Sequence, residues 1–267
     1  MNSIVMALGF DVVVMLLCYI YCQSKQRAGL VDAAWAFCIS VTAIGAALLQ
    51  SQGDVLVRWV VGGLTGLWFA RLSLHLARRY WQEDEEDSRY AAMRKALKQH
   101  QAVGFFGFFM AQALMALLFS VPMLLLTAQP SAVWSSGYQV WLAVAVVIGL
   151  VALIGETVAD QQLYRFKQDT ANRGKTLRTG LWRYSRHPNY FFEWLHWFAY
   201  PIIGIGVGMS YLWIYPLLMF GFLYYFTGIP FSERQALRNR GEDYRQYQQQ
   251  TSLFFPWKPN AQPLKDQ

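Results

Sequence analysis

Residues 134–158 read WSSGYQVWLAVAVVIGLVALIGETV, a run in which Glu156 is the only charged side chain. A helix needs about 20 apolar residues to cross the hydrocarbon core of a bilayer, so this run is long enough. Six further segments of similar character surround it, at 3–21, 31–49, 55–76, 103–126, 190–207 and 211–229. The sequence therefore predicts an all-α, polytopic membrane protein, a bundle of seven transmembrane helices.

The composition agrees with this class of protein. Of the 267 residues, 55% are hydrophobic and 16% aromatic, which is more than a soluble domain of this length needs. No basic residues precede the first apolar segment and no small-residue cleavage site follows it, so we expect it to be retained and not removed as a signal peptide. The three cysteines show neither Cys-x-x-Cys nor paired Cys/His spacing, so we predict no metal site and no disulfide framework.

The basic residues predict the orientation of the chain. Two follow the first apolar segment, six lie between the third and fourth, seven lie between the fifth and sixth, and six follow the seventh, while the other connections have none. By the positive-inside rule the N-terminus is outside and the C-terminus is cytoplasmic. The net charge of +7 then reflects insertion, and we expect no nucleic-acid partner. We predict a multi-pass protein of the bacterial inner (plasma) membrane with no obligate protein partner.

Residues 180–193, GLWRYSRHPNYFFE, carry cations, a proline and a carboxylate at the start of the sixth apolar segment. Pro188 suits the first turn of a helix. On that helix Asn189, Glu193, His196 and Tyr200 follow at i, i+4, i+7 and i+11, on one stripe. Because such a stripe would not face lipid, the pattern predicts a polar site at membrane depth.

Basic residues lie just before this predicted helix start. Its first N–H groups and the positive end of its dipole already favour anions, so the pattern indicates capture of phosphate. The alternative is a cation patch on anionic lipid, which would not need Asn189 and Glu193 buried behind it. The basic residues concerned are Lys175, Arg178, Arg183 and Arg186.

Other ionisable residues also fall at or near membrane depth. Asp32 opens the second apolar segment, Arg71 lies near the end of the third, and Glu156 and Asp160 close the fifth one turn apart. Such residues have functional or paired roles by default. The structural alternatives are that Asp32 caps its helix and that Arg71 extends its charge toward the membrane surface. The pattern offers no account of Asp11 in the first segment.

Three polar or terminal stretches complete the chain. The acidic run 83–87 is interpreted as a solvated helix face. A capping-box pattern at 232–235 predicts a helix that stops at Gly241. The last stretch, 253–257, is apolar enough that we expect it to fold back as a lid over the cytoplasmic mouth.

The segment 180–193 resembles the signature of the DUF1295 branch of the steroid 5-alpha-reductase superfamily. The sequences Asp32-x-x-Trp35, Arg89-Tyr90, Ala159-Asp160-Gln161 and Gly241-Glu-Asp-Tyr244 are similar to that branch as well. The resemblance implies a seven-helix membrane bundle that binds NADPH from the cytoplasm. It implies hydride transfer from NADPH to a carbon–carbon double bond conjugated to a carbonyl, in a lipophilic, steroid-like substrate that enters from the membrane lipid.

The resemblance also implies roles for particular residues within a single membrane domain, 1–267. Residues 1–126 would contact the substrate and 127–267 the cofactor. Steroid reductases polarise the carbonyl with a glutamate on the second helix and a tyrosine on the third. Asp32 falls near the position of the glutamate, and Trp68-x-x-Arg71 stands where tyrosine-x-x-arginine is expected. Asp32 and Arg71 are therefore the predicted catalytic residues, and the expected tyrosine is missing because Trp68 takes its place. The predicted NADPH-binding residues are Asp160, Arg165, Lys167, Arg178, Arg183, Arg186, His187, Asn189, Tyr190, Glu193, Glu233 and Tyr244.

Two alternatives remain open. Isoprenylcysteine carboxyl methyltransferases, which use S-adenosylmethionine, resemble the chain at Arg186-His187-Pro188-x-Tyr190-x-x-Glu193 and in the late Glu233, Gly241, Tyr244 spacing. The number of cations argues against this, since that methyl donor has no phosphates. A transporter or lipid-binding protein is the second alternative, but the inverted repeats and paired broken helices expected of transporters are not visible in the sequence.

Overall fold

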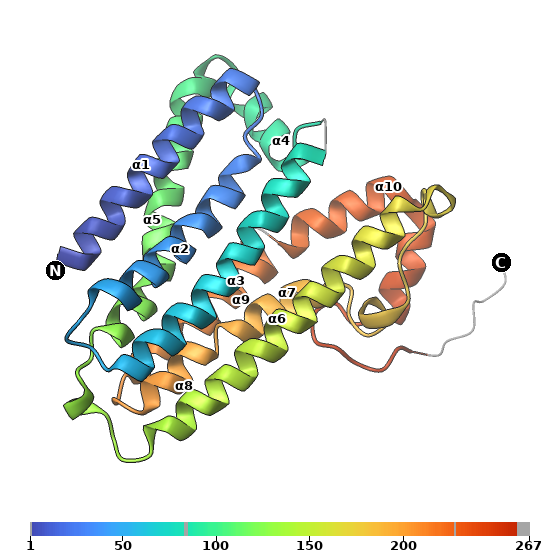
Figure 1. Ribbon diagram of the computed structural model, residues 1–267. Helices are drawn as coiled ribbons and strands as arrows, with labels where there is room; N and C mark the ends of the chain where they lie inside the picture. The colour runs from blue at the N-terminus through green and yellow to red at the C-terminus, as the bar shows by residue number, and fades with distance from the viewer. Residues whose placement is uncertain (1, 83–84, 227, 261–267) are drawn as a thin grey trace. The chain divides into compact units, whose positions relative to one another are not determined.

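The computed structural model describes residues 2–82, 85–226 and 228–260, and within these ranges the protein is helical with no strand (Figure 1). The all-α prediction is confirmed. The chain divides into two compact units, one of residues 1–142 and 203–208, the other of 143–202 and 209–267. The predicted functional halves, 1–126 and 127–267, stay a prediction.

The first unit contains four long helices and one short one. They are α1 (Asn2–Lys25), α2 (Leu30–Leu49), α3 (Val55–Gln82), α4 (Ser88–Leu97) and α5 (Gln101–Thr127), with 3-10 turns η1 (Lys98–His100) and η2 (Ser131–Val133). The α1–α2 and α2–α3 connections are a few residues long, which makes these neighbours antiparallel. Helix α2 packs against α1, α3 and α5, and α5 packs against α1 as well.

Small residues bring α2 and α3 into close contact. A Cβ atom added to Gly62 would lie 2.5 Å from the Cβ of Ala47, and one added to Gly66 would lie 2.7 Å from the Ile44 side chain. The Ser40 hydroxyl donates a 2.9 Å hydrogen bond to the Gly66 carbonyl across the same contact. Glycines four residues apart let transmembrane helices approach closely, and here they fix how α2 lies on α3.

The second unit is built around most of α6 (Tyr138–Gln168) and the C-terminal helices. These are α7 (Pro188–His196), α8 (Ala199–Ile205), α9 (Ile214–Gly221) and α10 (Ile229–Gln250), with turns η3 (Thr170–Asn172), η4 (Gly180–Arg183) and η5 (Ser210–Trp213) and the π-helical turn η6 (Phe222–Phe226). The described residues contain six helices long and apolar enough to cross a membrane. The predicted segment 190–207 is divided between α7 and α8, so the seven-helix count stays a prediction.

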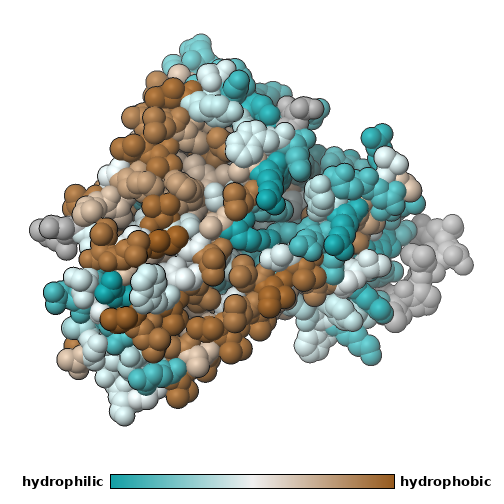
Figure 2. Space-filling model, in the orientation of Figure 1, coloured by the Kyte–Doolittle hydropathy of each residue, from teal (hydrophilic) through white to brown (hydrophobic). Residues whose placement is uncertain are grey.

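The surface is that of a membrane protein. Val5 on α1, Leu67 on α3 and Val147 on α6 each leave 60% or more of their area exposed, and Figure 2 shows apolar side chains gathered over long stretches of the visible face. Exposed apolar surface on this scale marks contact with another apolar phase. Together with the six apolar helices, it makes the chain an integral, multi-pass membrane protein.

The C-terminal segment confirms one prediction and part of another. The helix that begins at Ile229 ends at Gly241, whose φ of 52° and ψ of −120° are not helical, and a second helical stretch of α10 follows to Gln250. The apolar tail then folds back onto its own unit, where the Ser185 hydroxyl donates to the Phe254 carbonyl and the Trp257 N–H donates to the Tyr184 carbonyl. The role of lid stays a prediction.

Candidate functional site

The predicted signature segment docks on α6 through a tight turn. Gly180 adopts φ 61°, and a Cβ atom there would lie 2.4 Å from the Gln162 amide, so this position requires glycine. The Gln162 side chain accepts a 2.9 Å hydrogen bond from the Leu181 N–H, and the Trp182 indole donates to the Ala159 carbonyl. These contacts hold residues 180–183 against the last turns of α6.

Three members of the predicted polar stripe lie on α7, whereas Tyr200 lies on α8, beyond the turn at 197–198. Pro188 occupies the first turn of the helix, and the Asn189 amide donates a 3.4 Å hydrogen bond to Asp160 on α6. At the other end of the stripe, His196 and Tyr200 are buried and joined by a 2.6 Å hydrogen bond. Glu193 lies between them along the helix, half-buried. The structure therefore brings Asp160 and Asn189 together, as the polar-site prediction requires.

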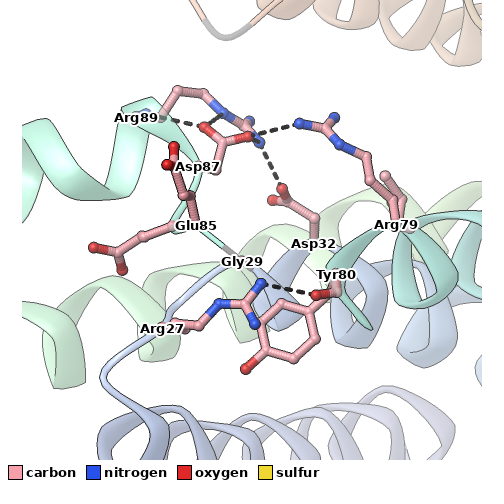
Figure 3. A pocket seen from close by; sticks show the side chains of 10 residues that line it. Arg27, Gly29, Asp32, Arg79, Tyr80, Glu85, Asp87 and Arg89 are labelled. Atoms are coloured by element: carbon pink, nitrogen blue, oxygen red, sulfur yellow. Dashed lines mark hydrogen bonds and ion pairs between the residues drawn. The ribbon is translucent and has the colours of Figure 1, made fainter. Parts of the chain in front are cut away.

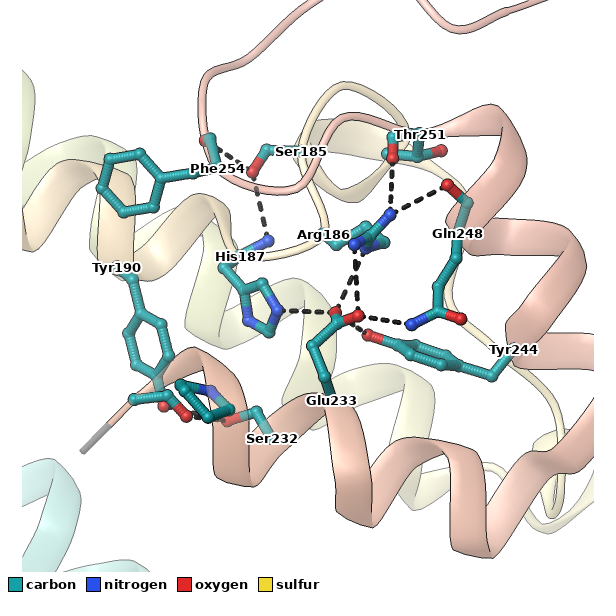
Figure 4. A network of polar contacts seen from close by, with 12 residues as sticks. Ser185, Arg186, His187, Tyr190, Ser232, Glu233, Tyr244, Gln248, Thr251 and Phe254 are labelled. Carbon is teal, nitrogen blue, oxygen red and sulfur yellow. Dashed lines mark hydrogen bonds and ion pairs between the residues drawn. The ribbon is translucent and has the colours of Figure 1, made fainter. Parts of the chain in front are cut away.

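A second polar network centres on Glu233 of α10 (Figure 4). Arg186 donates to both Glu233 oxygens through Nε and Nη2, at 3.1 Å each, and through Nη1 to the carbonyls of Gln248 and Thr251. Tyr244 donates to Glu233 at 2.5 Å. All three nitrogens of Arg186 thus have protein acceptors, and the residue joins the signature segment to α10.

His187 belongs to the same network. Its Nε2 lies 2.8 Å from Glu233 Oε1, and its ring stacks on Tyr190 with centroids 5.5 Å apart. Tyr190 in turn hydrogen-bonds Ser232 at 3.2 Å. Burial lowers the pKa of His187 below its usual 6.5, against the opposing effect of Glu233. The imidazole is therefore neutral at pH 7 and donates from Nε2 to the carboxylate.

The predicted cofactor-binding cations separate into two groups. Arg178 donates to the carbonyl and carboxylate of Asp243, at 2.6 and 2.8 Å, and Arg186 is engaged as described. These contacts join both arginines to other parts of the second unit, and their role in phosphate capture stays a prediction. The predicted cations that are exposed in the second unit are Arg165, Lys167, Lys175 and Arg183.

In the first unit, Asp32 is the centre of an ion network (Figure 3). Arg89 of α4 donates to its Oδ2 at 2.8 Å, and the Tyr90 hydroxyl donates to its Oδ1 at 2.6 Å. Both carboxyl oxygens of Asp32 thus accept a hydrogen bond from a side chain of α4. Arg71 lies on α3, half-buried, and does not line the pocket that contains Asp32.

That pocket is small and lies where α2, α3 and the loop before α4 meet. Charged groups of both signs line it. They are Arg27, Asp32, Arg79, Glu85, Glu86, Asp87 and Arg89, with Gly29, Leu76 and Tyr80 completing the wall.

The acidic run is more than a solvated face. Asp87 caps α4 by accepting from the Arg89 N–H, and it pairs with the guanidinium groups of Arg79 and Arg89. Burial raises the pKa of Asp87, but its hydrogen bonds to Arg89 and both cations outweigh burial and bring that pKa below its usual 3.8. Glu86 pairs with Arg94 at 2.9 Å. Residues 83–84 of the run lie outside the described residues.

Sequence reasoning therefore missed the partners of Asp32. Trp68 stands on α3 where a tyrosine was expected. The phenol that contacts the Asp32 carboxylate comes instead from Tyr90 of α4. The dipeptide Arg89-Tyr90 was noticed only as part of a family pattern, since no local periodicity links it to Asp32, 57 and 58 residues away.

Six apolar helices, with polar clusters at the ends of several of them, define an integral α-helical membrane protein. The model of the family described as "Protein of unknown function (DUF1295)" matches residues 18–251. The chain belongs to the DUF1295 family.

A relative is consistent with this assignment. An uncharacterized protein of Schizosaccharomyces pombe is 25% identical over 221 residues, which are 74% of this chain and 62% of the relative. The chain thus spans less than two thirds of the length of that relative. No solved structure matches the chain.

Proposed function

We propose that the protein is an NADPH-dependent reductase that transfers hydride to a conjugated carbon–carbon double bond in a lipophilic, steroid-like enone within the membrane. The observation that carries the proposal is the Asp160–Asn189 pair at the start of α7, in a unit that keeps Arg165, Lys167 and Arg183 exposed. The family resemblance of residues 180–193 supports it.

The residues of the second unit fit a phosphorylated dinucleotide in part. The exposed cations and the N–H groups at the start of α7 would hold phosphates. Asp160 and Asn189, with Glu193 one turn further, offer acceptors and an amide donor for ribose and carboxamide groups. Bound NADPH would supply the hydride. His187, Tyr190, Glu233 and Tyr244 would support this surface from behind, since they contact one another.

Asp32 takes a modified role in this proposal. It accepts hydrogen bonds from the Tyr90 hydroxyl and the Arg89 guanidinium and so orients these two donors. A donor near a developing enolate oxygen stabilises it. We propose that Asp32 acts through these two donors, and that Arg71 contributes positive charge on α3.

The test is NADPH binding and turnover of a panel of enone lipids by the purified protein. Arg183→Ala weakens NADPH binding about tenfold, the loss of one charge-assisted contact to phosphate. The matched control is Arg173→Ala, because Arg173 is also exposed in the same connection. Unchanged binding in the Arg183 variant would remove that residue from the proposed phosphate site.

A separate pair of variants tests Asp32. Asp32→Ala leaves NADPH binding intact and stops reduction. If the variant binds no NADPH although it is folded, the role assigned to Asp32 is wrong. Asn189→Ala has the opposite effect: it removes NADPH binding, and reduction is lost as a consequence.

A methyltransferase that uses S-adenosylmethionine is the second candidate. It is favoured by the engagement of Arg178 and Arg186 in the fold, since fewer cations are then available for phosphates. Analysis of the nucleotide that copurifies with the protein discriminates between the two. NADPH or NADP supports the reductase, and adenosylhomocysteine reverses the ranking.

We also propose seven crossings, in which α7 and α8 together form the sixth, with the N-terminus outside and the C-terminus cytoplasmic in a bacterial inner membrane. The basis is the distribution of Lys and Arg among the connections. Reporter fusions after Lys25, in the 128–137 connection and at the C-terminus test the orientation. A cytoplasmic signal from 128–137 contradicts it.

A further inference from the structure

The C-terminal tail, residues 252–258, runs alongside the signature segment, residues 180–193. Three hydrogen bonds pair the two stretches in antiparallel order, and Figure 4 shows the second of them. They join the Arg186 N–H to the Ser252 carbonyl, the Ser185 hydroxyl to the Phe254 carbonyl and the Trp257 N–H to the Tyr184 carbonyl, at 2.9, 2.8 and 2.9 Å. A surface that holds the tail therefore also holds the segment that leads into α7.

Aromatic packing fixes the tail on its own unit. The Phe255 ring stacks on Phe220 of α9, with centroids 6.3 Å apart and planes 26° apart, and it meets Phe191 of α7 edge-on at 6.3 Å. Phe254 contacts the same two rings and is only 2% exposed. The tail thus lies where α7 begins and α9 ends.

The outer side of this aromatic cluster is exposed. Phe255 and Trp257 leave 51% and 73% of their area exposed. Tyr225, in the turn that follows α9, is 66% exposed, and its ring contacts Phe220 with centroids 6.5 Å apart. Leu217 on α9 itself is 67% exposed. The exposed rings therefore continue the apolar surface of a segment that is apolar enough to cross a membrane.

Polar side chains begin directly beyond these rings. On α10 they begin at Ser232, and in the tail Lys258 follows Trp257 and is exposed. Lys258 is also the only charged residue in the sequence from 251 to 260. Rings at the end of an apolar surface, followed by a cation, are typical of a membrane–water interface, where Trp and Tyr are enriched and Lys extends its amine to the lipid headgroups.

We propose that residues 253–258 are an anchor in the interfacial layer of the bilayer. Phe255 and Trp257 lie among the lipid headgroups, and the Lys258 amine contacts the headgroup phosphates. The partner is the bilayer that surrounds α9, because the exposed rings are continuous with that helix. Through the three hydrogen bonds to residues 184–186, the anchor holds the start of α7 at the level of the headgroups. The proposal is independent of the reductase function.

Quenching of tryptophan fluorescence by brominated lipids tests the proposal. The protein is placed in nanodiscs whose acyl chains carry bromine near the headgroup end, near the methyl end or not at all. The wild-type minus Trp257→Phe difference isolates the emission of Trp257. Because this ring is 73% exposed, its replacement leaves the core intact. We expect the emission to be lost with bromine near the headgroup end and retained with bromine near the methyl end.

Trp197→Phe is the matched control for the quenching experiment. Trp197 is completely buried in the same unit, so its difference emission is retained with both brominated lipids. Two results overturn the proposal. Emission of Trp257 that neither lipid quenches places the tail away from the bilayer, as a lid over the cytoplasmic mouth or a contact with another protein requires. Emission lost only with bromine near the methyl end places the ring in the hydrocarbon core.

Hydrogen exchange tests the link between the anchor and the signature segment. In nanodiscs Trp257→Ser speeds exchange of the Arg186 amide, which donates to the tail at Ser252. Phe226→Ser is the control, because Phe226 is also exposed, at 68%, but lies outside the tail. Equal exchange rates of this amide in the two variants would show that the tail does not hold the segment.

Discussion

Replacing Arg186 by alanine tests whether this arginine supports the fold or binds a ligand. The side chains of Arg186 and Glu233 are only 11% and 13% exposed, and four contacts join the guanidinium to Glu233 and two carbonyls. Removing one partner of a buried ion pair costs about 3–5 kcal/mol, because the other charge is left uncompensated. His187 and Tyr244 still donate to Glu233, so we expect the lower end, about 3 kcal/mol.

Thermal unfolding in detergent, followed by the fluorescence of the 11 tryptophans, measures this loss. A loss of about 3 kcal/mol lowers the midpoint by about 6–12 °C, at about 2–4 °C per kcal/mol. Arg245→Ala is the matched control. Arg245 lies on α10, as does the Arg186 partner Glu233, and it pairs with Glu242 at 3.3 Å, but both of these side chains are 66% exposed. A wild-type midpoint for Arg186→Ala, combined with weakened NADPH binding, would refute the structural role and restore the phosphate role.

Two further predictions concern the first unit. Gly62→Ala destabilises it by about 1–3 kcal/mol, because the new Cβ overlaps Ala47. The control Gly63→Ala is neutral or stabilising by up to about 1 kcal/mol, because a Cβ there has nothing within 4 Å. Equal unfolding midpoints for the two variants would contradict the close packing of α2 on α3. Asp87 has a folded-state pKa below 3.8, so its contribution to stability is complete above pH 3.8 and is lost as the pH falls through the folded value. Asp87→Asn should therefore have a smaller loss of midpoint between pH 5 and pH 3 than the wild type, and an identical acid profile would exclude that role.

The features that sequence predicted are those that depend on neighbouring residues. Hydropathy predicted the long helices, because the length of an apolar run is a local property of the sequence. Pro188 marked the start of α7, since proline is favoured in the first turn. The alignment of Asn189, Glu193 and His196 along α7 followed from helical periodicity, while the hydrogen bond from Asn189 to Asp160 of α6 was not part of that prediction.

The features that sequence did not predict depend on distant partners. A basic residue before a helix has the same local pattern whether it binds phosphate or reaches a carboxylate 47 residues later, as Arg186 does with Glu233. The division of 190–207 into α7 and α8 is equally invisible to hydropathy, since the residues around Trp197 are apolar in either case. Gly241 was predicted as a helix stop, and its non-helical φ and ψ confirm this, but the second helical stretch that follows it to Gln250 was not predicted.

Buried and exposed arginines have different roles in this protein, and this difference limits the sites at which an anionic ligand could bind. A guanidinium that loses its water must recover its hydrogen bonds from protein acceptors, as Arg186 and Arg89 do. Once satisfied in this way it would have to break those bonds to bind a phosphate, which offsets most of the gain. An exposed guanidinium such as that of Arg183 exchanges only water for phosphate. Any anionic ligand of the second unit should therefore bind at the exposed cations and not at Arg186.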